Sequence, residues 1–171
     1  MIKLLGTAMI LLGSGSAGFG FARAVRAQLR QLNALLAALE TIKGEIEYRL
    51  TPLPELFAAL GEGTEPVTAA FFRGCAAMME ADRALPPQLV LGRAMEQTTS
   101  LQWSARTRET VRNLAFSLGK FDLGGQVRAI ELAQERLRAE LVEVQAGSRA
   151  RCRSYETIGI CAGLALAVIL L

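Results

Sequence analysis

The stretch that decides the fold is LGGQVRAIELAQERLRAELVEV, residues 123 to 144. Its apolar residues recur at steps of four, three, seven, four and three, with Gln134 in the one polar slot: Leu123, Val127, Ile130, Leu137, Leu141 and Val144. This spacing predicts an α-helix with one face packed against a neighbour. Asp122 directly before it is the expected N-cap. Since only Gly147 interrupts good helix formers before Tyr155, we expect the helix to run on into the apolar C-terminal segment.

The rest of the chain also has the periodicity of helices and none of strands. A first long helix to about Arg49 is predicted by apolar residues three or four positions apart: Leu29, Leu32, Leu36, Leu39, Ile46 and Leu50. Thr51 and Pro52 predict the cap and first position of a short second helix ending near Leu60. Three more helices are expected, from Pro66 to about Arg83, from Leu89 to about Leu101 and from Trp103 to Leu118. The expected fold is all-α, a compact bundle of about six helices with an apolar membrane helix at each end.

Both ends of the chain are apolar and are bordered by arginines. Residues 2 to 22 contain one charge, Lys3, and residues 158 to 171 contain none. The bordering clusters are Arg23, Arg26 and Arg30, and Arg149, Arg151 and Arg153. Because basic flanks of a membrane segment stay on the cytoplasmic side, we expect a membrane helix over 1–22, a cytoplasmic bundle over 23–154 and a membrane-inserted helix over 155–171. The first and last long helices then run antiparallel.

The location of the positive charge favours lipid over nucleic acid as its partner. Residues 32 to 146 contain 12 Lys and Arg against 15 Asp and Glu, whereas the whole chain has a net charge of +3. The excess therefore lies beside the apolar ends, where it would meet anionic headgroups. The bundle itself has no basic patch with interleaved aromatic residues, so no nucleic-acid partner is expected.

Other readings of the two ends stay open. The small residues after Leu12 also fit a cleaved secretory signal, although arginines soon after the cleavage point oppose that reading. The 14 uncharged residues at the C-terminus span only about 21 Å as a helix, so they recruit Tyr155 to Thr157, thin the bilayer, enter it part way or form a buried core helix. Gly159 and Gly163 form a GxxxG pair that favours close helix packing within the membrane, and a homo-oligomer is possible.

The composition argues against catalysis. The chain has no histidine, which excludes imidazole bases and His metal sites, and its three cysteines form no CxxC pair. Cys75 is expected in the core, while Cys152 between two arginines is a weak acylation candidate. No nucleotide-binding fingerprint occurs. We expect no enzyme activity, no metal and no cofactor.

Several short motifs occur in order along the chain: Gln28 to Leu32, Leu39-Glu40, Glu45 to Tyr48, Thr51 to Leu53, Leu118-Gly119 with Asp122 and Gln126, then Tyr155, Gly159 and Gly163-Leu164. Together they resemble the stage III sporulation protein AB family from end to end. Two departures are the Gly124-Gly125 pair, where an acidic or polar residue is expected, and Pro54 so soon after Pro52. Pro54 is tolerable in a first helical turn, whose N–H groups lack helical partners.

The resemblance implies a membrane scaffold or adaptor of the channel or secretion apparatus between mother cell and forespore, acting with a sister ATPase. It places the protein in the cell membrane on the mother-cell side of the forespore, with its main domain cytoplasmic. It also implies a helical domain similar to the cytoplasmic domain of the type II secretion platform protein. The alternative from the residues alone is a membrane-tethered lipid or signal sensor that responds to anionic lipid.

Candidate partner-docking residues surround the corner after the first helix: Glu40, Glu47, Tyr48, Glu55, Asp122 and Gln126. Glu131, Glu135 and Glu140 are expected on the outer, polar side of the last helix, which pairs with the first. Such an acidic face would meet a basic surface on the ATPase and speed association. The alternative is a solvated helix surface with weak ion pairs.

Overall fold

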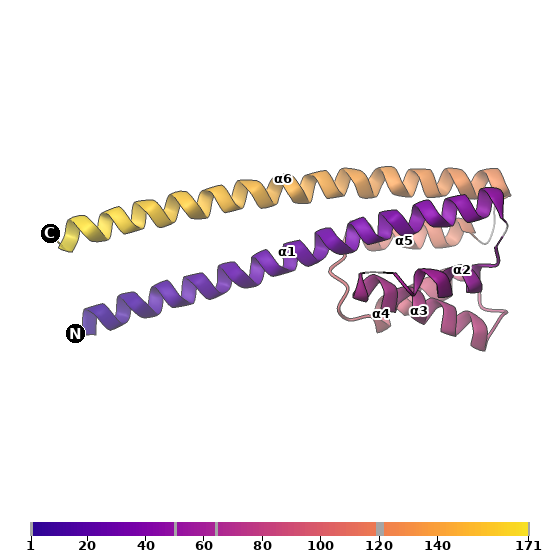
Figure 1. Cartoon of the computed structure of the whole chain (residues 1–171), viewed down its shortest axis with the longest axis horizontal. Helices are drawn as coiled ribbons and strands as arrows, with labels where there is room; N and C mark the ends of the chain where they lie inside the picture. Colours follow the sequence, from indigo (N-terminus) through magenta and orange to yellow (C-terminus); the bar gives the residue numbers. More distant parts are fainter. Residues whose placement is uncertain (1, 50, 64, 119–121, 171) are drawn as a thin grey trace. The chain divides into compact units, whose positions relative to one another are not determined.

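The computed structural model describes residues 2–49, 51–63, 65–118 and 122–170, and the side chains of those between 23 and 147. This part of the chain is all-α, with no strand, as the sequence predicts (Figure 1). Its helices are α1 (Ile2–Tyr48), α2 (Leu53–Leu60), α3 (Pro66–Ala81), α4 (Pro87–Gln97), α5 (Ala105–Leu118) and α6 (Leu123–Leu170). The unbroken course of α6 past Gly147 confirms the expectation from its sequence.

The chain divides into two units. One contains Met1–Val25 and Val142–Leu171, the outer parts of α1 and α6; the other is the helical bundle Arg26–Leu141. Among the residues with described side chains, no helix has the length and apolarity needed to span a bilayer. The predicted membrane segments, 1–22 and 155–171, lie outside those residues. Both segments therefore stay predictions.

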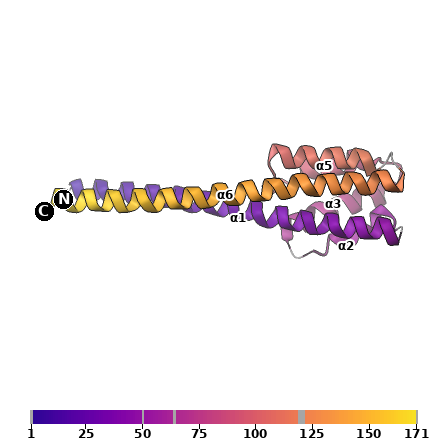
Figure 2. The same ribbon diagram turned by 90° about the horizontal axis from the view of Figure 1, so that it is seen from above.

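The long helices α1 and α6 pair along one side of the bundle. Within Arg26–Leu141 they lie side by side in both views (Figure 1 and Figure 2). The buried face of α1 consists of Leu32, Leu35, Leu39, Ile42 and Ile46. From α6, Ile130 and Leu137 are 0% exposed and Gln134 lies between them, which confirms the predicted stripe and its polar slot. Leu123, the first residue of that stripe, is instead 46% exposed.

Helices α2 to α5 pack consecutively along the chain, α2 on α3, α3 on α4 and α4 on α5. Their shared core is aromatic: the ring centroid of Phe72 lies 5.8 Å from that of Phe57 and 5.1 Å from that of Phe71, which lies 5.0 Å from that of Trp103. Edge-on and tilted ring pairs of this kind contribute about 0.5–1.5 kcal/mol each beyond burial of their area. Cys75 lies in the same core, as predicted.

The turn between α1 and α2 is held by a different bond from the predicted one. Thr51 does not cap α2, whose N-cap is Pro52 with no side-chain hydrogen bond. The Thr51 hydroxyl instead donates to Glu45 Oε2 at 2.5 Å, and Arg49 reaches Glu45 Oε1 at 3.4 Å. A carboxylate on the last turns of α1 therefore closes the corner, because it gives the Thr51 hydroxyl a charged acceptor, and hydrogen bonds to charged groups are stronger than neutral ones.

Helix α4 begins and ends earlier than predicted, at Pro87 and Gln97. The following segment to Ser104 is irregular because distant side chains bind its backbone. Gln31, 1% exposed, donates to the Ser100 carbonyl at 3.3 Å and accepts from the Gln102 N–H at 2.7 Å. Arg108 donates to the carbonyls of Trp103, Leu101 and Met95. Since these bonds satisfy backbone groups that a helix would otherwise pair, the loop is stable without helical structure.

Candidate partner-docking site

Polar bonds tie α1 to α6 across the outer face of the bundle. Lys43 Nζ lies 2.6 Å from Glu131 Oε1, and Gln134 Nε2 donates to Glu40 Oε2 at 2.7 Å. Moving forward along α1 from Glu40 to Lys43 means moving backward along α6 from Gln134 to Glu131. The two helices are therefore antiparallel, as the sequence predicts.

The bond between Lys43 and Glu131 shifts the pKa of the lysine. The hydrogen bond from Lys43 to Glu131 raises the pKa of the lysine above its ordinary value, against a lowering by partial burial. The negative charges of Glu131, Glu47 and Glu40 act in the same direction as the bond. Glu131 is thus engaged in an ion pair, and its charge is offset at the surface.

Glu40 is the hydrogen-bond acceptor of the buried Gln134 side chain. The Gln134 side chain is 3% exposed, and a buried amide needs a hydrogen-bond acceptor. Glu40 supplies it, while Arg138 approaches the same carboxylate only to 4.0 Å. Glu40 therefore has an evident role in holding α1 against α6.

Four of the remaining candidates are exposed. We call Glu47, Tyr48, Glu55, Asp122 and Gln126 the α1–α2 corner, which lies where α1 ends and α6 begins (Figure 1 and Figure 2). Tyr48 is 83% exposed, a large aromatic side chain left in solvent. Glu47 and Glu55 are exposed as well, and Glu55 lies in the first turn of α2, where the helix dipole stabilises its charge.

Asp122 has the predicted capping role. Its Oδ1 accepts a hydrogen bond from the Gly125 N–H at 3.2 Å at the start of α6. Its side chain is nevertheless exposed, and Gln126, one turn further, is half-buried. A Cβ at position 124 would come within 3.9 Å of the Asp122 carboxylate, an ordinary contact, so the Gly124 departure places no steric demand on this turn.

The prediction for Glu140 is wrong. It was expected on the outer, polar side of α6, yet its side chain is 4% exposed. Its Oε2 accepts from Thr107 Oγ1 at 2.9 Å, while its Oε1 has no hydrogen-bond partner among the described residues. Thr107 lies in the first turn of α5, capped by Ser104 Oγ at 3.0 Å. The carboxylate is therefore buried beside the positive end of α5, which offsets part of its desolvation.

Of the membrane-flanking arginines and the glycine pair, the structure describes the side chains of the first arginine cluster. Arg23, Arg26 and Arg30 are exposed on α1. Arg149, Arg151, Arg153, Gly159 and Gly163 belong to α6, but their side chains lie outside the described residues.

The described interior offers one thiol and no cluster of metal-ligating side chains. Within the part of the chain with described side chains, no group of three His, Cys, Asp or Glu residues is close enough to hold a metal ion. Burial raises the pKa of the Cys75 thiol to about 12, so at neutral pH it is a protonated, inert core group. The surface that the sequence singled out therefore offers charges and an exposed aromatic ring.

A family model described as stage III sporulation protein AB matches residues 3–171. The chain belongs to this family. Stage III sporulation protein AB of Bacillus subtilis (strain 168) is 26% identical over 182 residues, covering 100% of both chains. A solved structure of stage III sporulation protein AB (SpoIIIAB) covers 72% of this chain and 98% of its own, with a TM-score of 0.68 and 19% identity. At that identity the likeness establishes the shared fold alone. The resemblance read from the sequence is confirmed: the protein belongs to a sporulation stage III family, and its described residues form six helices.

Proposed function

We propose that this member of the stage III sporulation protein AB family is a non-enzymatic membrane scaffold of the apparatus between mother cell and forespore. In this proposal the bundle faces the mother-cell cytoplasm, the two apolar ends hold it in the membrane, and other proteins of the apparatus assemble on it. The sister ATPase is the expected partner of the bundle. The absence of histidine from the sequence supports a role without catalysis of its own.

The α1–α2 corner carries the proposal. Tyr48 at 83% is the most exposed of the bundle's described large hydrophobic side chains, and aromatic side chains are enriched at the centres of protein interfaces. Glu47 and Glu55 are exposed acids on the two helices that meet at this corner. An aromatic anchor beside acidic residues fits a partner surface that presents a pocket bordered by lysine or arginine.

Binding of the purified ATPase to the full chain in nanodiscs tests the proposal. We expect the Glu47→Lys, Glu55→Lys double variant to bind more slowly than the parent, with the larger difference at low salt, because the charges act through long-range steering. Tyr48→Ala should instead speed dissociation at all salt concentrations, because it removes an anchor.

The matched control is the Glu80→Lys, Glu96→Lys double variant, which makes the same change in net charge at exposed positions of α3 and α4. Its association rate should be closer to that of the parent than the rate of the Glu47→Lys, Glu55→Lys variant is. If the corner and control variants slow association equally, only net charge matters and the corner is no docking site. If the parent itself shows no binding, the ATPase is not a direct partner of this chain.

A further inference from the structure

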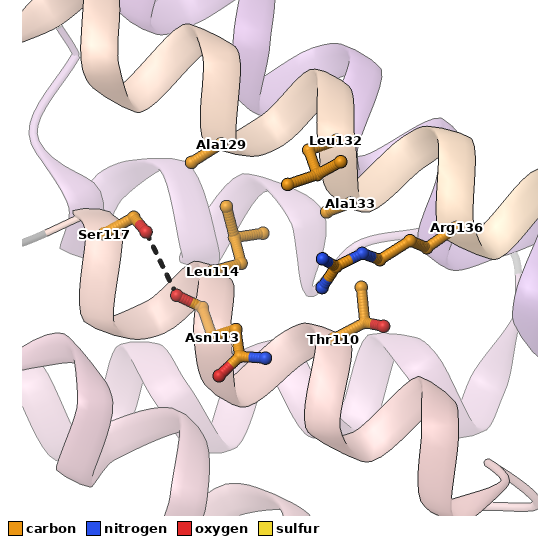
Figure 3. A pocket seen from close by; sticks show the side chains of 8 residues that line it. All are labelled: Thr110, Asn113, Leu114, Ser117, Ala129, Leu132, Ala133 and Arg136. Atoms are coloured by element: carbon orange, nitrogen blue, oxygen red, sulfur yellow. Dashed lines mark hydrogen bonds between the residues drawn. The ribbon is translucent and has the colours of Figure 1, made fainter.

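A groove between α5 and α6 lies outside the α1–α2 corner. We call it the α5–α6 groove; its lining includes Thr110 and Leu114 from α5 and Ala129, Leu132, Ala133 and Arg136 from α6 (Figure 3). These residues enclose a hollow of about 60 Å³. A second hollow shares Thr110 and Arg136 with the first and extends along the same two helices to Arg106, Glu109 and Ala139. From Ala129 to Ala139 the groove is about 15 Å long, close to three turns of helix.

The floor of the groove is apolar, and its rim carries polar and charged side chains, among them Asn113, Ser117 and Arg136. Leu114 and Ala133 are 4% exposed and form its floor, whereas Leu132 is 48% exposed and stands at the edge. The Arg136 guanidinium reaches from α6 toward Thr110 on α5, over the hollow (Figure 3). Among the described residues it has neither a hydrogen bond nor an ion pair. The groove therefore presents an apolar hole with an unneutralised cation beside it.

These features select the class of ligand. Both walls are helices whose backbone groups are already paired, so a partner cannot add a strand and must be recognised through side chains. A hollow of about 60 Å³ accepts a small aliphatic side chain, being close to two shares of liquid water volume. A carboxylate one turn away on the same helix would pair with Arg136, in the two-pronged geometry that guanidinium favours.

We propose that the α5–α6 groove is a second docking surface, which binds an acidic amphipathic helix of another protein. A second copy of this chain is the poorer occupant. In a two-fold pairing the same patch meets itself, so the Arg136 guanidinium of each copy would face a surface that presents the same cation.

Photo-crosslinking in sporulating cells tests the proposal on the full chain. The photoreactive residue p-benzoylphenylalanine replaces Leu132 in one variant and Leu89 in the control. Leu89 on α4 is also 48% exposed, so it matches Leu132 in accessibility. We expect the Leu132 adduct to contain a helical peptide from a different protein, with an aliphatic residue and an aspartate or glutamate within one turn of it.

The charge requirement supplies the second readout. Adding Arg136→Glu to the Leu132 variant should lower the adduct yield about tenfold or more, the equivalent of 1.4 kcal/mol, whereas Arg136→Lys should retain most of it. The proposal is overturned if the adduct peptide comes from a second copy of this chain, if it has no such carboxylate, if Arg136→Glu leaves the yield unchanged, or if Leu132 yields no more adduct than Leu89.

Discussion

Replacing Thr107 by valine should destabilise the bundle, because it leaves the buried Glu140 carboxylate without a partner on either oxygen. Thr107 is 0% exposed and Glu140 4%, and among the described residues the carboxylate has one hydrogen bond, accepted at 2.9 Å from the Thr107 hydroxyl. Valine keeps the shape of threonine, and the position 107 N–H can still donate to Ser104 Oγ. The substitution therefore removes the hydroxyl that donates to Glu140 and accepts from Ser104 Oγ at 3.5 Å, and it leaves the N–H cap of α5 in place.

The expected cost follows from the burial. An unsatisfied buried polar group costs about 1–3 kcal/mol, and more when the group is charged, so we expect a loss of about 3 kcal/mol in the free energy of unfolding. For a chain of this size that corresponds to a fall of roughly 6–12 °C in Tm. Adding Glu140→Leu should restore most of the loss, because replacing both partners by apolar groups is nearly neutral.

Urea unfolding of the full chain, followed by the fluorescence of its one tryptophan, measures this loss. Trp103 is 5% exposed and lies in the loop that leads into α5, so its emission reports on the affected region. Thr110→Val is the matched control: that side chain is 4% exposed, but its hydroxyl donates only to the Arg106 carbonyl of its own helix. Equal urea midpoints for the two valine variants would refute the role assigned to Thr107.

Three smaller predictions concern the corner, a tight helix end and the buried thiol. Thr51→Ala should lower the free energy of unfolding by about 1 kcal/mol in urea melts by removing the bond to Glu45, and in a Glu45→Ala background it should have almost no effect. Gly61→Ala should lower the free energy of unfolding by about 1–3 kcal/mol in the same assay. The new Cβ would lie 2.5 Å from Arg73 Cγ and 3.0 Å from the Ala58 carbonyl oxygen. Adding Arg73→Ala should relieve part of that loss. With Cys152 and Cys161 replaced by alanine, Cys75 should react with a thiol reagent only after the protein unfolds. Burial raises the pKa of this thiol from 9.0 to about 12, so the thiol of the unfolded chain ionises at a lower pH than that of the folded chain. The free energy of unfolding should therefore fall as the pH rises above 9. Rapid labelling of the native variant at pH 8 would contradict its burial.

The repeating faces of the long helices could be predicted from the sequence because their cause is local. Burial of Ile130, Gln134 and Leu137 follows from positions three or four apart on a single helix, and any neighbour would bury the same face. Leu123 breaks the pattern at the very start of α6. The period shows which residues share a face, but not how far along the helix the neighbour extends.

The positions that could not be predicted depend on partners far along the chain. In the loop after α4, the Ser100 carbonyl accepts a hydrogen bond from Gln31, which lies 69 positions earlier in the chain. The buried Glu140 carboxylate accepts one from Thr107, which lies 33 positions earlier. No spacing rule connects such residues, so Glu140 looked like one more acid on a polar face. For the docking site, the helix end at Tyr48 was predictable from Thr51-Pro52, whereas the engagement of Glu40 by Gln134 required the register of α1 against α6.

The fold also decides how the predicted topology has to be tested. If residues 23–154 face the cytoplasm, a membrane-impermeant maleimide should leave them unlabelled in intact cells, and Cys75 is the natural thiol to try first. Its burial and its pKa of about 12 make it unreactive from either side, so a negative result at Cys75 would say nothing about topology. Tyr48→Cys places a thiol at a position that is 83% exposed.

In a chain whose Cys152 and Cys161 are alanine, this thiol should react only after the membrane is permeabilised. An Arg128→Cys variant is the control, because position 128 is exposed on α6 in the same unit of the chain and should give the same answer. Labelling of both thiols in intact cells would place the bundle on the outer side. The arginines at both ends would then need an explanation other than retention in the cytoplasm, because they would lie on the translocated side of the membrane.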